Sequence, residues 1–194
     1  MYVCYHRGEQ KMSTVSSQHS NPLSPRRGKS ADTATARWRR EVPAPIRSLS
    51  ALANPDYSDI VTATINETPA EPEQVIHAAL KGVPRGLLIL IPFVQRAVLG
   101  LRLKLRPSPD HLLGWKIADR GENWIRIEAA SWFLTGHVVM HVDHGRMSFA
   151  SFIRYERRIA ALVWPPVSLI HRQVALALVR GAIRVQQETL HRQA

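Results

Sequence analysis

The stretch SWFLTGHVVMHVDHGRMSFASFIRYERR, residues 131–158, decides the fold of this chain. Apolar and polar side chains alternate along it on both sides of His144-Gly145. A glycine-containing pair between alternating runs favours a two-residue turn, because such a turn needs backbone torsions with positive φ. The stretch therefore predicts one long β-hairpin.

The same pattern predicts the register of the hairpin. With the turn at 144–145, Asp143 faces Arg146 and Met140 faces Phe149. Every second pair outward from the turn is mostly apolar, and the pairs between them are more polar. A slip of one residue would exchange the two faces, so the sequence specifies this register. We expect a sheet with one buried face and one face in water.

Two shorter alternating runs in residues 112–129 predict a second pair of strands. With a three-residue loop between them, Ile117 faces Ile125 and Trp115 faces Ile127. The side chains with odd numbers then point inward in both strands.

Between the two pairs of strands, the inward phase must change from odd to even residue numbers. A turn or bulge at residues 129–131 would make that change. Trp132 and Leu134 are then expected to point inward.

The region before these strands predicts one strand and two helices. Residues 57–66 are rich in β-branched side chains and form the first predicted strand. Residues 72–82 predict a helix that begins at a proline and stops at a glycine. A second helical stretch runs over residues 84–101, with a kink at Pro92 because proline lacks an N–H. The wide apolar surface of this stretch predicts burial against the sheet.

A long helix is predicted from about Val167 to Thr189, directly after Pro165-Pro166. Its apolar residues recur at helical spacing, as Val167, Ile170, Val174, Leu178, Ala182 and Val185. One narrow face stays polar, so we expect the helix to lie across the sheet for most of its length.

Residues 1–50 differ in composition from the rest of the chain. They are rich in Ser, Thr, Pro and Arg, and with nine basic and three acidic residues they hold about half of the net charge of +11. Such a stretch buries too little apolar surface to offset its ordering entropy. We therefore expect a disordered basic tail at 1–50 and one folded domain at 51–194.

The basic clusters of this tail are PRRGK at 25–29 and RWRR at 37–40. They could contact the phosphates of nucleic acid or an anionic membrane surface, with Trp38 stacking or inserting. We favour a plain solvated tail over these contacts, and nucleic acid is the less favoured partner.

One cysteine, Cys4, excludes an internal disulfide and a cysteine-based metal cage. The apolar stretches 86–95 and 159–171 fall short of the roughly 18 residues that a membrane span needs. We therefore expect a cytoplasmic protein without a transmembrane segment. Peripheral membrane contact and the oligomeric state are left open.

Three residues of metal-ligating type share one face of a predicted strand. His137, His141 and Asp143 carry groups that zinc or another divalent ion accepts. Alternation places them opposite Leu134 and Val138, on the face expected to be wet. We therefore interpret them as surface residues and predict no metal site and no cofactor.

The predicted inner face is apolar with few polar groups. A sheet that faces one long helix often leaves a cavity of this character, although plain core packing is the alternative. The candidate cavity residues are Trp115, Ile127, Trp132, Met140, Phe149, Ser151, Tyr155 and His171. The sequence contains no phosphate loop, nucleophile elbow or helical zinc motif, so catalysis is left open.

The predicted order is strand, two helices, four or more antiparallel strands and a long C-terminal helix. This is an α+β helix-grip arrangement, in which a curved antiparallel sheet wraps around the last helix. On LTGHVVMHVD, SFIRYERR and WPPVSLIHRQVALALVRGA, the chain resembles an uncharacterised bacterial family of the START-like (SRPBCC) superfamily, over roughly residues 55–188.

The resemblance implies that an apolar or amphipathic small molecule binds between the sheet and the long helix. The alternative is an enzyme of the cyclase or hydratase kind that uses the same cavity. Tyr155, as a hydrogen-bond donor, or His171, which titrates near neutral pH, would then serve as acid–base. Contact of the basic tail with nucleic acid or an anionic membrane is a further alternative.

Overall fold

The computed structural model describes residues 35–65, 72–81, 83–104, 106 and 108–193. Its elements in chain order are β1 (Arg37–Arg39), α1 (Ala44–Arg47), β2 (Tyr57–Thr64), α2 (Pro72–Lys81), α3 (Arg85–Phe93), η1 (Val94–Val98), β3 (His111–Leu112), β4 (Trp115–Arg120), β5 (Trp124–Ala130), β6 (Leu134–Asp143), β7 (Arg146–Tyr155) and α4 (Ala160–Gln193). The element η1 is a stretch of π-helix that directly follows α3. The predicted tail up to residue 34 lies outside the described residues.

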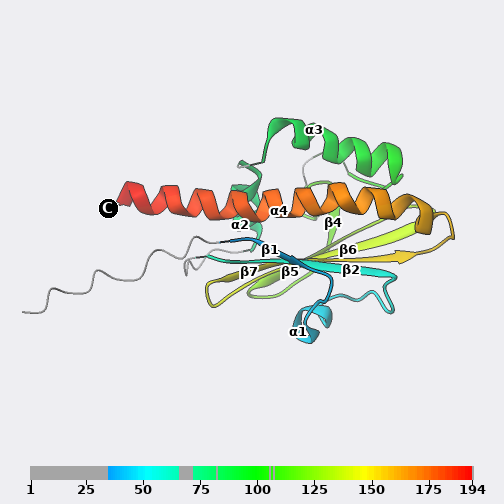
Figure 1. Cartoon of the computed structure of the whole chain (residues 1–194), viewed down its shortest axis with the longest axis horizontal. Helices are drawn as coiled ribbons and strands as arrows, with labels where there is room; N and C mark the ends of the chain where they lie inside the picture. The colour runs from blue at the N-terminus through cyan, green and yellow to red at the C-terminus, as the bar shows by residue number, and fades with distance from the viewer. Residues whose placement is uncertain (1–34, 66–71, 82, 105, 107, 194) are drawn as a thin grey trace, which may run out of the picture. The chain divides into compact units, whose positions relative to one another are not determined.

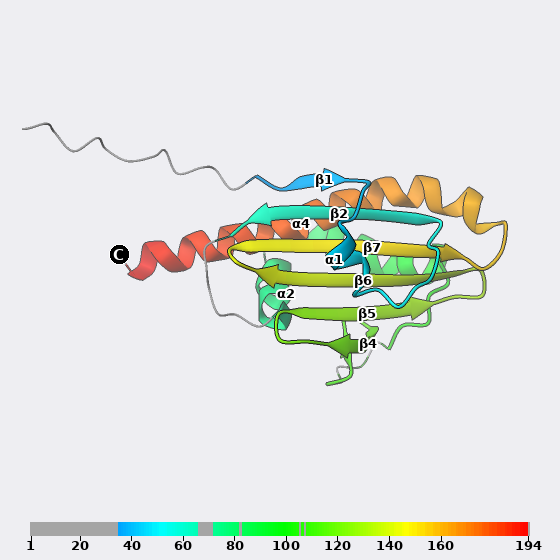
Figure 2. The ribbon, with the colours of Figure 1, turned by 90° about the horizontal axis from the view of Figure 1, so that it is seen from below.

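In the part of the chain that the structure describes, seven strands form one antiparallel sheet in the order β1-β2-β7-β6-β5-β4-β3 (Figure 2). Helices α2, α3 and α4 lie on one side of this sheet, and α1 lies on the other (Figure 1). The sheet is curved and does not close, and the C-terminal helix packs against its inner face. The α+β class and the helix-grip arrangement are therefore confirmed.

The β6–β7 hairpin has the predicted register along its whole length. Asp143 pairs with Arg146 beside the turn, and Leu134 pairs with Tyr155 at the far end. The turn residues His144 and Gly145 have φ angles of 44° and 68°. Positive φ at both central residues is the type I′ geometry that fits the twist of the flanking strands.

The predicted register between β4 and β5 is wrong by two residues. Ile117 pairs with Ile127 instead of Ile125, because the turn lies at residues 121–124, where Arg120 pairs with Ile125 and the Gly121 N–H donates to the Trp124 carbonyl. This displaces the register by three residues at the turn, and a bulge between Ile117 and Asp119 takes one residue back. A shift of two residues preserves the side-chain phase, so Trp115, Ile125 and Ile127 are buried on the inner face as expected.

The buried face of α4 follows the predicted helical spacing. Val167, Val174, Leu178 and Ala182 are buried in the inner core with the sheet residues, and Ile170 is half-buried. The inner core of the protein is therefore the contact of α4 with the concave side of the sheet.

Helix α4 begins at Ala160, seven residues before the predicted start at Val167. Pro165 and Pro166 lie inside the helix, in its second turn, where proline removes a donor to the carbonyl four residues earlier. The carbonyls that lose these donors belong to Ala161 and Leu162, and both residues are solvent-exposed, so water can reach them. The prediction treated the two prolines as a start signal, whereas the helix runs through them.

Because α4 runs through its prolines, it is longer than the apolar stretches judged from the sequence. Ala160–Arg184 is long and apolar enough to cross a membrane by length and composition, with a mean hydropathy of 1.3 and 33% of the window buried. In this structure that buried part packs against the sheet as the core helix.

The central part of the outer face of the sheet is covered, which corrects two predictions. Val42, Ile46 and Leu52 pack with Leu49 on the outward side chains of the sheet, which are Ile60, Val139, Ala150 and Phe152. Residues 35–50 therefore belong to the folded domain and are not part of a disordered tail. The middle of the outer face of β6 and β7 is likewise buried where water was expected, and only the ends of this face are partly or fully exposed.

Helix α2 matches its prediction and packs against α4. In the second helical stretch Pro92 lies inside α3, and the π-helical turn η1 follows at once. Burial of α3 against the sheet, however, is wrong, because no residue of α3 is fully buried. Since α4 already occupies the inner face of the sheet, α3 lies beside α4 and farther from the strands (Figure 1).

Replacing Gly181 with alanine should destabilise the fold. A Cβ atom at this position of α4 would collide with the backbone carbonyl oxygen of Ala79 in α2, so one helix must move. We expect a loss of about 1–3 kcal/mol in the free energy of unfolding, measured by urea denaturation. Gly86→Ala is the matched control, because a Cβ there meets open space. Equal stability of the two variants would contradict the tight α2–α4 contact.

Candidate functional site

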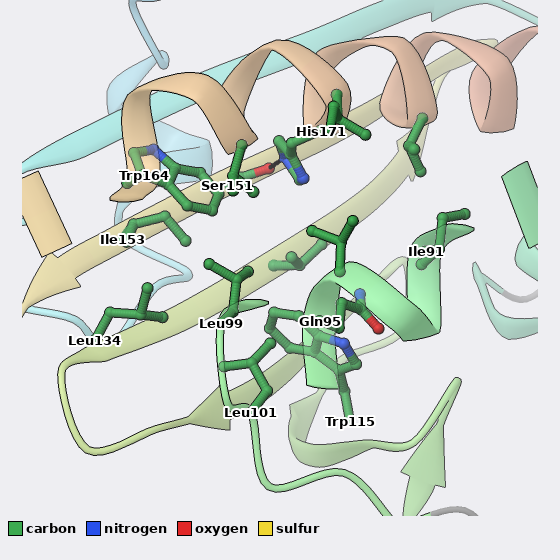
Figure 3. A pocket seen from close by; sticks show the side chains of 15 residues that line it. Ile91, Gln95, Leu99, Leu101, Trp115, Leu134, Ser151, Ile153, Trp164 and His171 are labelled. Carbon is green, nitrogen blue, oxygen red and sulfur yellow. Dashed lines mark hydrogen bonds between the residues drawn. The ribbon is translucent and has the colours of Figure 1, made fainter. Parts of the chain in front are cut away.

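An apolar cavity lies between the inner face of the sheet, α4 and the α3–η1 segment (Figure 3). Its volume is about 60 Å³. The lining residues are Ile91, Val94, Gln95, Leu99, Leu101, Trp115, Leu134, Val138, Ser151, Ile153, Trp164, Val167, Ile170, His171 and Val174. Most of these side chains are hydrocarbon, and the polar groups are few.

The structure brings three of the predicted cavity residues together, namely Trp115, Ser151 and His171. Ile127, Met140 and Phe149 are buried on the same inner face but do not line the cavity. Trp132 and Tyr155 also lie outside the lining.

Trp132 does not point inward, which corrects its predicted orientation. Its side chain is 59% exposed, whereas the neighbouring Phe133 is buried. The connection between β5 and β6 is a tight turn in which the Ser131 N–H donates to the Leu134 carbonyl at 2.9 Å. The inward phase therefore changes within residues 131–133, two residues later than predicted.

Tyr155 lies at the end of β7 and is half-buried. Its backbone N–H donates to the Asp56 carboxylate at 2.6 Å. Burial, followed by the negative charge of Asp56, raises the pKa of its phenol above the usual 10.0. The phenol does not line the cavity. Its raised pKa keeps it protonated at neutral pH.

Sequence reasoning missed the wall formed by α3 and η1, and it missed Trp164 at the start of α4. The apolar run at 84–101 was a signal for burial, but it was assigned to contact with the sheet alone. Trp164 lay in the segment placed before the helix, so its inward direction could not be read from helical spacing.

The polar end of the cavity is a hydrogen bond between Ser151 and His171. Ser151 Oγ lies 2.7 Å from His171 Nε2 (Figure 3). Burial lowers the pKa of this imidazole below 6.5; the nearby Asp59 opposes this effect, and Arg172 adds to it. The imidazole is therefore neutral at neutral pH, and it can offer a donor or an acceptor to a bound molecule.

The buried carboxylate of Asp59 lies next to this pair. Asp59 is only 2% exposed. It accepts hydrogen bonds from the Tyr57 hydroxyl at 2.6 Å and from Trp38 Nε1 at 3.0 Å. Both donors bind the same oxygen, Oδ2, and burial together with the bond to Asp59 raises the pKa of the Tyr57 phenol.

The same network accounts for Trp38, which was a candidate for stacking on nucleic acid. The Arg172 guanidinium lies over the Trp38 ring at 4.1 Å, and the Arg40 guanidinium lies over the Tyr57 ring at 4.3 Å. Trp38 is half-buried in these contacts and is part of the fold.

Ser151, His171 and Asp59 do not form a serine-hydrolase triad. The Asp59 carboxylate lies 3.9 Å from His171 Nε2, the same ring nitrogen that contacts Ser151. A triad needs the carboxylate on the other ring nitrogen, where it orients the imidazole as a base. The arrangement can instead hold a polar group of a ligand at the end of an apolar cavity.

His137 is buried on the outer face, which corrects its expected exposure to water. Its Nδ1 lies 3.5 Å from Ser50 Oγ, and its Nε2 lies 3.7 Å from a Glu128 oxygen. Burial lowers the pKa of His137, and Glu128 opposes this effect. His141 is half-exposed. Within the described ranges, no three His, Cys, Asp or Glu side chains are grouped as a metal site would require.

Comparisons with known proteins add little to this geometry. No family model and no curated protein matches the chain. A crystal structure of TTHA0849 from Thermus thermophilus aligns over 67% of this chain and 97% of its own, with 17% identity and a TM-score of 0.32. CalU16 from Micromonospora echinospora aligns over 80% of this chain and 90% of its own, with 11% identity and a TM-score of 0.28. Neither likeness carries a functional conclusion.

Acid should destabilise the fold through His137 and His171. Burial lowers both pKa values below 6.5, so the unfolded chain binds protons that the folded chain resists. The free energy of unfolding therefore falls as the pH drops below 6.5, by at most about 1.4 kcal/mol per pH unit for each histidine. Urea unfolding between neutral and acidic pH measures this slope.

His171→Gln and His137→Gln should each reduce the slope. His144→Gln is the control, because the His144 side chain is exposed in the hairpin turn. An unchanged slope in both buried-site variants would show that these histidines titrate as freely in the folded protein as in the unfolded one.

Proposed function

We propose that this protein binds an apolar or amphipathic small molecule in the cavity between the sheet and α4. The observation that carries the proposal is an almost wholly apolar lining with one polar pair, Ser151 and His171, at its end. Sites for small molecules combine these two features, because hydrocarbon surface supplies affinity and a few polar groups fix orientation.

The size of the cavity sets a condition on binding. Its volume of about 60 Å³ is smaller than the roughly 150 Å³ that holds a benzene-sized molecule. One wall must therefore move outward when a ligand enters. The α3–η1 segment is the wall suited to this movement, because α3 has no fully buried residue and its hydrogen-bond ladder is interrupted at Pro92.

The polar pair suggests what the ligand carries. Ser151 is fully buried, and His171 is neutral at neutral pH, so the pair offers hydrogen bonds without a net charge. A hydroxyl, a carbonyl or a protonated carboxyl group fits this end of the cavity. A fully ionised group would have to lose its hydration without gaining a countercharge from this pair.

Acid–base catalysis in the same cavity is the second candidate, and the 2.7 Å contact between Ser151 and His171 favours it. A neutral imidazole in an apolar site is able to accept a proton from a bound substrate. Only His171 can serve here, because Tyr155 does not line the cavity. His171→Gln should then abolish turnover while leaving the fold intact.

Filling the cavity should abolish binding of an amphipathic probe. We expect 1-decanol and 1-hexadecanol, presented to the full chain in native mass spectrometry, to bind one molecule per chain. Val167→Phe places a larger side chain in the cavity and should weaken binding roughly tenfold or more, by steric exclusion.

Leu162→Phe is the matched control, because Leu162 is on the same helix and points into solvent. Circular dichroism of both variants verifies that the fold is kept. Ser151→Ala should retain hydrocarbon binding but lose the preference for a polar end group. Equal probe binding by wild type and Val167→Phe would contradict the location of the site.

A further inference from the structure

The outward side of α3 and η1 is an exposed apolar surface. It consists of Leu88, Ile89, Leu90, Phe93 and Val98, and we name these residues the α3 surface. Ile89 is 74% exposed and Phe93 is 61% exposed. Large apolar side chains in consecutive turns of one short helix form a contiguous patch, and such patches mark contact sites.

Nothing in the described part of the fold covers this surface. Leu87, Ile91, Val94 and Gln95 face inward, and the last three of them line the cavity. The α3 surface therefore points away from the cavity. The amino-terminal half of α4 runs beside α3 (Figure 1) and exposes Leu162 and Leu169, which are 77% and 60% exposed.

The charged residues in the sequence on both sides of α3 have one sign. From Gln74 to Pro109 the sequence contains no Asp or Glu, but it contains six basic residues: Lys81, Arg85, Arg96, Arg102, Lys104 and Arg106. Arg85 and Arg96 flank the apolar residues and are exposed. Among the described residues, no carboxylate forms an ion pair with either arginine.

An anionic lipid bilayer matches both properties. Its headgroups supply negative charge at the interface, and the acyl boundary just below them accepts apolar side chains. A second copy of this chain matches less well. In a symmetric contact the α3 surface would meet itself, which would bring Arg85 and Arg96 against their like-charged counterparts.

We propose that the α3 surface docks this protein on the face of a bilayer that contains anionic lipid. Ile89 and Phe93 enter the interface, and Arg85 and Arg96 contact the headgroups. Docking then places the wall of the apolar cavity directly on the membrane. The inference rests on exposure and charge, and it stands whether or not the cavity holds a ligand.

Vesicle co-sedimentation of the full chain tests this docking. We expect binding to vesicles of phosphatidylcholine with phosphatidylglycerol, and much weaker binding to phosphatidylcholine alone. Added salt should weaken binding because it screens the headgroup charge. Ile89→Asp/Phe93→Asp should weaken binding roughly tenfold or more, because two charges replace the inserting side chains.

Three controls separate the alternatives. Leu113→Asp alters an exposed leucine away from α3 and should bind vesicles like wild type. Arg26→Glu/Arg27→Glu removes charge from the amino-terminal segment and should retain most binding. Val167→Phe fills the cavity and should also bind like wild type, so docking and ligand binding can fail separately.

Two results would overturn the proposal. The first is loss of vesicle binding in Arg26→Glu/Arg27→Glu with full binding in Ile89→Asp/Phe93→Asp, which would place the contact in the amino-terminal segment. The second is an absence of vesicle binding by a wild-type chain that is dimeric in light scattering and becomes monomeric on Ile89→Asp/Phe93→Asp. The α3 surface would then be covered by a second copy.

Discussion

Burial of the β6–β7 hairpin on both faces is the constraint on which the structure depends. Successive side chains of a strand point to opposite faces, so a hairpin with apolar residues on both needs two covers. On the inner side, Met140 and Phe149 lie under α4. On the outer side, Val139 and Phe152 lie under α1 and the residues around it. The segment around α1 and the helix α4 thus pack on opposite faces of the same two strands.

The cavity follows from the way in which the inner cover is made. Side chains of β4, β6 and β7 form one wall of the cavity, and side chains of α4 form another. The α3–η1 segment closes that space from the side with few buried contacts of its own. The well-buried core of the sheet and α4 therefore adjoins a cavity wall, α3–η1, that has few buried residues. The Ser151–His171 pair provides the polar end of the cavity. The Asp59 carboxylate, which accepts a hydrogen bond from the Tyr57 hydroxyl, lies next to this pair.

The sequence predicted what depends on local pattern and missed what depends on distant partners. The hairpin register followed from His144-Gly145 and strict alternation. The outer cover was missed because Val42, Ile46 and Leu52 are sparse apolar residues in a segment rich in Ser, Pro and Arg. The β4–β5 register failed because the turn lies closer to β5 than predicted, and alternation alone does not specify where the turn lies. Trp115, Ser151 and His171 were found through side-chain phase, whereas the Asp59 network joins residues far apart in the chain.

The central claim is that a firm core of sheet and α4 adjoins a movable α3–η1 wall, and hydrogen exchange of the backbone amides tests it most directly. The account predicts fast exchange in α3 and η1 through local opening, and slow exchange in β6, β7 and the buried half of α4. A ligand that fills the cavity should slow exchange in η1. Protection of α3 equal to that of β6 in the free protein would contradict the account, because the cavity could then not widen to admit a ligand.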